Sequence, residues 1–214
     1  MSPPDPYRRA GLERNPFCHD VVAATFIDRG VGPAPEPRQR LFVQLVGVKG
    51  AGKTTQLGRW RAEHAGPHHW VPPSRGRWRR LPVAPIAYWD EIDRAPVRLV
   101  RSALRRASAA GATVVAGTHL DLGHLADDAG LDVRTHDLPA LTPAEVRRWA
   151  MERLRSARLP GTDRELLLED SLADDVARDA GGSWRVAGDL MHAWVARQVA
   201  TAMAGGNIDA QEVR

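Results

Sequence analysis

The stretch LFVQLVGVKGAGKTT (41–55) constrains the fold more than any other part of this chain. The apolar run Leu41–Val46 is typical of a buried strand, and it leads directly into Gly47, four further residues and then Gly52-Lys53-Thr54. A helix-compatible segment follows. Strand, glycine-rich loop and helix in this order are typical of a phosphate-binding loop. We therefore expect an α/β fold with a mostly parallel central sheet flanked by helices.

The residue types in this loop suit the binding of a nucleoside triphosphate. Glycines let the backbone curl so that successive N–H groups face phosphate oxygens, and the following helix adds its positive N-terminus. Lys53 would reach the β- and γ-phosphates, and the Thr54 hydroxyl would bind Mg²⁺. Only two of the 30 basic residues are lysines, and both lie in this loop. The predicted nucleotide-binding residues are Gly47, Val48, Lys49, Gly50, Ala51, Gly52, Lys53, Thr54 and Thr55.

A second candidate element is the apolar segment 83–91, which ends in Asp90-Glu91. Pro85 suggests that strand pairing begins after it. An acidic pair at the carboxyl end of a buried strand lies where ligands bind in an open α/β sheet. Asp90 would hold Mg²⁺ through water, and Glu91 would be the general base that polarises the attacking water. The alternative is that the two acids only cap a following helix.

A third strand is predicted at 112–117, and it is followed by Thr118-His119. Either side chain could read the state of the nucleotide by hydrogen bonding to the attacking water or to phosphate. The alternative is that Thr118 only caps the next turn. The sequence does not choose between Thr118 and His119.

The remaining pattern predicts three regions: an N-terminal extension and linker (1–39), an α/β core (40–140) and a small helical lid (141–214). In the core we expect helices at 53–64 and 95–110 and further strands at 68–73 and 131–138. Thr142-Pro143-Ala144-Glu145 is a capping box that would start a helix reaching about residue 158. Helical turns are expected at 164–169 and 171–180, other short elements at 19–28 and 208–213, and a long helix at 184–203.

Composition excludes several classes of protein. The single cysteine, Cys18, rules out an internal disulfide and any multi-cysteine metal site, which suits a cytoplasmic protein. We expect no secretory signal and no membrane span, because the chain has neither an apolar signal core nor a run of about 18 apolar residues. The net charge of +4 permits an acidic partner without requiring one. Arginines interleaved with Trp78 in the loop 75–80 suggest contact with nucleic acid, although a solvated loop is the commoner meaning of such a run.

Taken together, these motifs resemble the AAA+ and STAND-type P-loop ATPases that use a catalytic glutamate. Asn15-Pro16-Phe17 is similar to a motif that precedes the first strand in bacterial AAA+ switch proteins. The segment 138–145 resembles the connection between the last core strand and the helical lid of such proteins. The resemblance implies that Asp90-Glu91 is the Walker B pair, that Thr118 is sensor 1, and that Arg185, in the lid turn 180–185, is sensor 2. It also implies ATP and Mg²⁺ as ligands, a homo-oligomer and a protein partner. No arginine finger can be assigned: Arg98, Arg101, Arg105, Arg106 and Arg134 are all positioned for it.

Three other functions share some of these features. The loop Gly50–Gln56 is close to that of thymidylate kinases, but Asp93-Arg94-Ala95 lacks the aromatic residue that such a kinase needs, and Glu91 favours attack by water. A GTPase could use Thr118-His119-Leu120-Asp121 as a degenerate base-reading motif, but it would also need Asp-x-x-Gly, and Asp90 is instead followed by Glu91-Ile92-Asp93. A nucleotide-gated interaction module with little turnover needs the same site as an ATPase, so the sequence does not separate the two.

Overall fold

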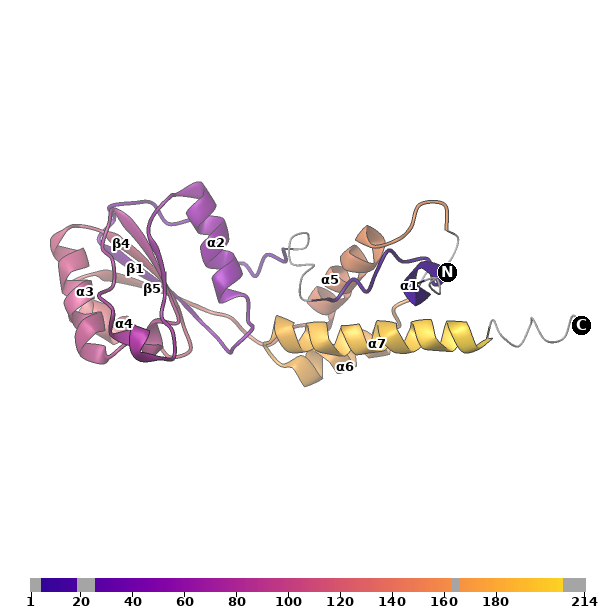
Figure 1. Ribbon diagram of the computed structural model, residues 1–214. Helices are drawn as coiled ribbons and strands as arrows, with labels where there is room; N and C mark the ends of the chain where they lie inside the picture. The colour runs from indigo at the N-terminus through magenta and orange to yellow at the C-terminus, as the bar shows by residue number, and fades with distance from the viewer. Residues whose placement is uncertain (1–4, 19–25, 163–165, 206–214) are drawn as a thin grey trace, which may run out of the picture. The chain divides into compact units, whose positions relative to one another are not determined.

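The computed structural model describes residues 5–18, 26–162 and 166–205. Contacts divide the chain into two compact units. The α/β unit comprises residues 29–139, and the helical unit comprises residues 140–214 together with 1–28 (Figure 1). The segment predicted as an N-terminal extension, 1–39, therefore contributes to both units.

The α/β unit is built on a five-stranded parallel sheet in the order β2-β3-β4-β1-β5. This arrangement confirms the predicted fold class, and each strand begins within two or three residues of its predicted start. Pro85 lies just before β3, as expected, and its carbonyl accepts the amides of Arg38 and Thr113. The strands are β1 (Leu41–Val46), β2 (His68–Trp70), β3 (Ile86–Asp90), β4 (Thr113–Thr118) and β5 (Asp132–Asp137).

Helices cover both faces of the sheet (Figure 1), which is why the central strands are apolar on both sides. Helices α3 (Val97–Ala109) and α4 (Gly123–Asp127) pack on one face, where Phe42, Trp89 and Val114 are fully buried. Helix α2 (Lys53–Glu63) packs on the other through Leu57 and Trp60. The two edge strands, β2 and β5, are largely exposed.

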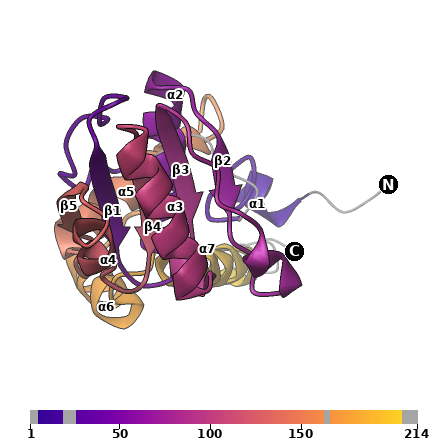
Figure 2. The same ribbon diagram turned by 90° about the vertical axis from the view of Figure 1, so that its left-hand side faces the viewer.

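Two short 3₁₀ turns connect these elements. The first, η1 (Arg75–Trp78), lies in the loop that follows β2. The second, η2 (Ile92–Arg94), follows β3 after Glu91 and leads into α3, which lies in front of the sheet in Figure 2.

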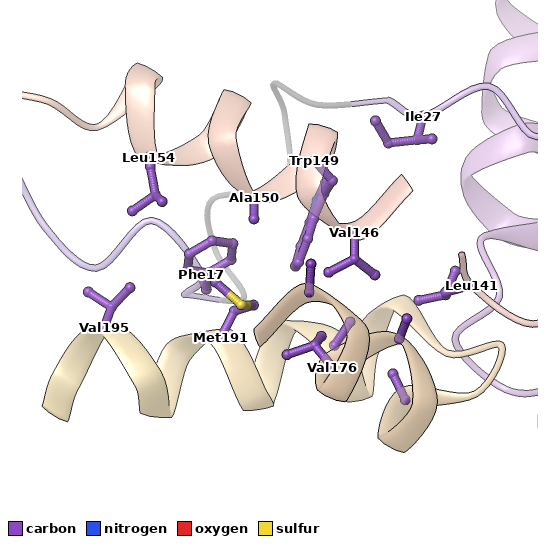
Figure 3. Close-up of a cluster of buried hydrophobic side chains, with 14 of the residues drawn as sticks. Phe17, Ile27, Leu141, Val146, Trp149, Ala150, Leu154, Val176, Met191 and Val195 are labelled. Carbon is purple, nitrogen blue, oxygen red and sulfur yellow. The ribbon is translucent and has the colours of Figure 1, made fainter. Parts of the chain in front are cut away.

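The helical unit contains α1 (Pro6–Arg9), α5 (Pro143–Ser156), α6 (Asp170–Ala180) and α7 (Trp184–Gly205). The predicted capping box is present: the Thr142 hydroxyl accepts from the Glu145 amide at 3.2 Å, and the Glu145 carboxylate accepts from the Thr142 amide at 2.8 Å. The core between α5, α6 and α7 is filled by residues such as Val146, Trp149 and Met191 (Figure 3).

The segment Asn15-Pro16-Phe17 is part of this helical core. Phe17 is 2% exposed, and its ring lies 5.0 Å from that of Trp149. Asn15 is also buried, and its side-chain amide donates to the carbonyl of His192 in α7 at 3.0 Å. Since a buried amide needs such a partner, this contact explains why an asparagine occupies the position.

The helical turns predicted at 164–169 are wrong for the part of that segment that the structure describes. Helical turns were expected over 164–169, but residues 166–169 have no regular structure. Leu166 and Leu168 pack against the helical core, whereas Leu167 between them is 76% exposed. Alternate burial is typical of extended chain rather than of a helix. The rest of that prediction, most of the element expected at 19–28 and all of the one at 208–213 lie outside the described residues, and residues 26–28 have no regular structure.

Among the residues that the structure describes, no helix has both the length and the apolar character needed to cross a bilayer.

Candidate functional site

The candidate site lies where three neighbouring strands end. Val46 of β1 is paired with Thr118 of β4, and Gly117 of β4 is paired with Asp90 of β3. Because the strands are parallel, their carboxyl ends meet at one edge of the sheet. This edge is the usual place for a ligand in an open α/β sheet. The structure therefore brings together the glycine-rich loop 47–55, which is predicted to bind phosphate and is called the phosphate loop below, the acidic pair Asp90-Glu91 and the polar end of β4.

The phosphate loop is shaped by glycines with left-handed backbone conformations. Gly50 has a φ of 87° and Gly52 a φ of 98°, and α2 begins at the next residue. Side chains with a Cβ rarely adopt these angles. Gly47 is needed for a different reason: a Cβ there would lie 3.1 Å from the Cβ of Leu138 and 3.2 Å from that of Ala51. Val48, Lys49, Thr54 and Thr55 are exposed around the loop.

Lys53 lies inside the loop and is only 4% exposed. Its Nζ donates to the carbonyl of Gly47 at 2.6 Å and to that of Val48 at 3.0 Å. Burial lowers the pKa of Lys53, and the carboxylates of Glu91 and Asp90 partly oppose that shift. The ammonium is thus held in the cradle by carbonyl oxygens, a position from which phosphate oxygens could replace them.

Thr54 and Asp90 meet across the site. The Thr54 hydroxyl, in the first turn of α2, donates to Oδ2 of Asp90 at 2.7 Å, and Asp90 is 1% exposed. Oδ1 of Asp90 accepts the amide of Glu91 at 3.1 Å, which orients the carboxylate. A hydroxyl and a carboxylate offer oxygen ligands of the kind that Mg²⁺ prefers. Their chemistry and proximity fit the predicted metal site.

Gly117 was not predicted as part of the site. A Cβ at this position would lie 2.6 Å from Oδ1 of Asp90, 3.2 Å from Cδ1 of Leu57 and 3.5 Å from Cβ of Lys53. The absence of a side chain therefore allows β3 and α2 to approach each other across β4. The signal in the sequence was a glycine inside the strand Thr113–Thr118, directly before Thr118, a position where glycine marks a close approach.

Glu91 has an unusual backbone and charged neighbours. Its φ of 57° lies in the left-handed region, which costs a residue other than glycine about 1 kcal/mol. Oε2 of Glu91 lies 3.0 Å from Nη2 of Arg94 and 3.4 Å from Nδ1 of His119. Within the part of the chain that the structure describes, no hydrogen bond of regular geometry reaches this buried oxygen. The carboxylate is therefore held by ion pairing rather than by a directed hydrogen bond.

Thr118 and His119 occupy different environments. Thr118 is fully buried, and its hydroxyl donates to the carbonyl of Leu120 at 2.8 Å and accepts the Leu120 amide at 3.1 Å. These bonds match the alternative role of Thr118 as a cap of the next turn. His119 instead approaches the acidic residues: its amide donates to Oδ1 of Asp93 at 3.2 Å, and its Nδ1 lies 3.2 Å from Oδ2. Sequence reasoning gave neither Asp93 nor Arg94 a role in the site, although η2 places both beside Glu91.

Glu91, Asp93 and His119 could also hold a metal ion, because their ligand atoms lie within 4.8 Å of one another. The Arg94 guanidinium, 3.0 Å from Glu91, already supplies a positive charge there. A cation at that point would be repelled, so Thr54 and Asp90 remain the better metal ligands.

Two other candidate residues, Arg185 and Asp121, have surroundings of their own. Arg185 is exposed in the first turn of α7 and belongs to the helical unit, and its role as sensor 2 stays a prediction. Asp121, which a GTPase would use to read guanine, accepts the Gly123 amide at 2.7 Å and the side-chain amide of Gln44. These hydrogen bonds lower the pKa of Asp121 and indicate a structural role.

No protein-family model matches the chain, and neither does any curated protein. Among solved structures, the chain is similar to the RuvB Holliday junction branch migration motor of Thermotoga maritima, with 22% identity and a TM-score of 0.47. The match covers 70% of this chain and 52% of that one. A single-substitution variant of that RuvB matches with 21% identity and a TM-score of 0.48, over the same shares of the two chains. The chain thus spans about half the length of these structures, and no activity follows from the likeness.

Proposed function

We propose that this protein binds ATP with Mg²⁺ and hydrolyses it, as a small P-loop ATPase of the AAA+ or STAND type. One observation carries the proposal. The Thr54 hydroxyl lies 2.7 Å from Oδ2 of Asp90. Beside them the buried ammonium of Lys53 donates to two carbonyls of the loop and has the carboxylates of Glu91 and Asp90 nearby. Phosphate oxygens and a divalent ion would satisfy all three side chains at once.

The chain's own residues would divide the work as follows. The ammonium of Lys53 would donate to phosphate oxygens in place of the carbonyls of Gly47 and Val48. The phosphates would then supply negative charge beside this buried cation. Thr54 and Asp90 would hold Mg²⁺, which neutralises charge on the phosphates when it is bound. Glu91 would orient a water for in-line attack and accept its proton. For that step Oε2 would have to leave Arg94.

Titration calorimetry tests the binding half of this proposal. We expect ATP to bind in the presence of Mg²⁺ and to bind at least tenfold more weakly in EDTA, because two oxygen ligands converge at Thr54 and Asp90. GTP and thymidine monophosphate serve as comparison ligands. Undetectable ATP binding in Mg²⁺ would contradict the proposal, and phosphorylation of thymidine monophosphate by ATP would establish the kinase alternative.

The second candidate function is a nucleotide-gated module with little turnover, and the surroundings of Glu91 favour it. Oε2 of Glu91 lies 3.0 Å from the guanidinium of Arg94 and 3.4 Å from the imidazole of His119, so the carboxylate must leave these neighbours before it can take a proton from water. ATP would then hold a closed form, and the output would be a partner surface. Light scattering in ATP, ADP and no nucleotide, together with the basal turnover rate, separates the two. Slow turnover with ATP-dependent assembly supports the module, and fast turnover without assembly supports the ATPase.

Several finer assignments depend on the resemblance alone. They are a homo-oligomer, a protein partner and Arg185 as sensor 2. Two more assignments come from the residue pattern: either Thr118 or His119 as the reporter of the γ-phosphate, and nucleic-acid contact through 75–80. For the reporter, the supporting geometry favours His119, because its ring lies beside Glu91 whereas the Thr118 hydroxyl is engaged with Leu120.

A further inference from the structure

The charges between residues 64 and 120 are distributed very unevenly. The only acidic residues in this range are Asp90, Glu91 and Asp93, and all three lie at the candidate site. Apart from Arg94, the arginines in the same range lie in two segments, the loop 75–80 and helix α3, and neither segment contains an Asp or a Glu. The positive charge of these segments therefore has no carboxylate of its own to neutralise it.

The two segments lie side by side in the folded unit. At the start of α3, the guanidinium of Arg98 lies 4.9 Å from the ring centroid of Trp78. Toward its end, Nη2 of Arg106 donates to the carbonyl of Leu81 at 2.9 Å. The chain from 78 to 81 thus follows α3 for most of its length, and Figure 2 shows α3 on this face of the sheet.

The exposed arginines of α3 form one stripe. Arg98, Arg101 and Arg105 are spaced by three and four residues, so they share one side of the helix. Val100, Ala103 and Leu104 are buried on the opposite side against the sheet. We call this stripe, together with residues 75–80, the arginine face.

The arginine face differs from arginine-rich helices elsewhere in the chain. In α6, Arg178 contacts Asp175 and Asp179, and in α5, Arg155 contacts Glu152. At the border of the arginine face like charges oppose one another: burial lowers the pKa of Arg106 in α3, and the neighbouring Arg80 lowers it further. Concentrated positive charge of this kind attracts a polyanion.

The exposure of Trp78 indicates which class of polyanion the arginine face would bind. Its side chain remains 46% exposed although two guanidiniums, of Arg77 and Arg98, lie within 6 Å of its ring. An acidic protein partner would be expected to meet a larger apolar core, and a duplex offers no unstacked base. An exposed tryptophan among arginines suits a strand whose bases stack while its phosphates pair with guanidiniums.

We propose that the arginine face binds single-stranded nucleic acid. Phosphates would lie along the stripe of Arg98, Arg101 and Arg105, and a base would stack on Trp78. This binding does not depend on the ATPase proposal, because none of these side chains belongs to the candidate nucleotide site.

The test is fluorescence anisotropy of a labelled oligothymidylate of about 20 nucleotides, long enough for one or two such sites. Arg98→Glu/Arg101→Glu should weaken binding at least tenfold, and the slope of log affinity against log salt should fall by about 0.7 for each phosphate that is no longer bound. The matched control is Arg148→Glu/Arg197→Glu, the same charge change on exposed arginines of the helical unit, which should retain most of the affinity. Circular dichroism and the melting temperature establish that each variant is folded.

Trp78→Ala separates stacking from charge. It should weaken binding of the oligothymidylate about tenfold while leaving the salt slope unchanged. Equal weakening in the two double variants would overturn the assignment of the face. Tighter binding to a duplex of the same length, or to phosphatidylserine vesicles without oligonucleotide binding, would overturn the assignment of the partner.

Discussion

The close approach at Gly117 provides a sharp test of the site. In Gly117→Ala, the new Cβ would lie 2.6 Å from Oδ1 of Asp90, and one of the two must move by about 0.8 Å to reach ordinary contact. Gly117 is not among the residues with a positive φ, so alanine brings steric crowding without backbone strain. Crowding of this size in a packed interior costs about 1–3 kcal/mol of unfolding free energy.

The variant should also lose metal affinity, which a loss of stability alone does not cause while the protein stays folded. Moving Asp90 breaks its 2.7 Å hydrogen bond with Thr54, so the apparent Mg²⁺ affinity in the presence of ATP should fall by about 10–100-fold. Calorimetric titration with Mg²⁺ measures that affinity, and urea unfolding measures the stability.

The matched control for this variant is Gly58→Ala in α2. A Cβ there meets nothing within 4 Å, so alanine in this helix should stabilise the protein by about 0.5–1 kcal/mol and leave Mg²⁺ affinity unchanged. Full Mg²⁺ affinity in Gly117→Ala would refute the proposal that Asp90 and Thr54 form the metal site.

Three further predictions concern buried or paired groups. Lys53→Met should abolish ATP binding in calorimetry while lowering the melting temperature of the nucleotide-free protein little, because burial already lowers the pKa of Lys53 and so penalises its charge. Arg94→Ala removes the 3.0 Å ion pair of Glu91 and should raise the basal phosphate-release rate several-fold; an unchanged or lower rate would argue against a restrained base. Burial raises the pKa of Tyr88 to about 12, so the stability that this phenol contributes is complete below its unfolded pKa near 10 and is lost as the pH rises through about 12. Tyr88→Phe should therefore cost about 1–2 kcal/mol at pH 8, because it removes the phenol that donates to the carbonyl of His64 at 2.8 Å, and that difference should shrink in alkaline urea titrations.

The α/β unit could be predicted from the sequence because its signals are local. The glycine-rich loop follows an apolar strand, and the central strands β3 and β4 are apolar runs bounded by breakers such as Pro85 and Gly111. Parallel strands then place the residues after 46, 90 and 117 at one edge of the sheet. A pattern along the chain was therefore enough to predict which ends meet.

The contacts around Glu91 could not be predicted in the same way. They depend on the left-handed conformation of Glu91 and on the tight η2 turn, which together bring Asp93 and Arg94 back toward the end of β4. A left-handed glutamate is rarely predicted, because most residues other than glycine avoid that region. The choice between Thr118 and His119 depended on the same unpredicted turn.

The extended segment 166–169 was missed for a different reason. The run of leucines at 166–168 suits a helix by propensity, but only alternate leucines contact the helical core. Tertiary packing therefore overrides the local preference at this place.

The central claim is that Glu91 drives hydrolysis of an ATP held by the phosphate loop, and the variant Glu91→Gln tests it most directly. Glutamine keeps the shape of the side chain and removes its basicity, so radiolabelled ATP should stay bound and unhydrolysed while the wild-type protein converts it to ADP. Glu63→Gln, an exposed change in α2, should hydrolyse like the wild type. Hydrolysis by Glu91→Gln at the wild-type rate would contradict the account.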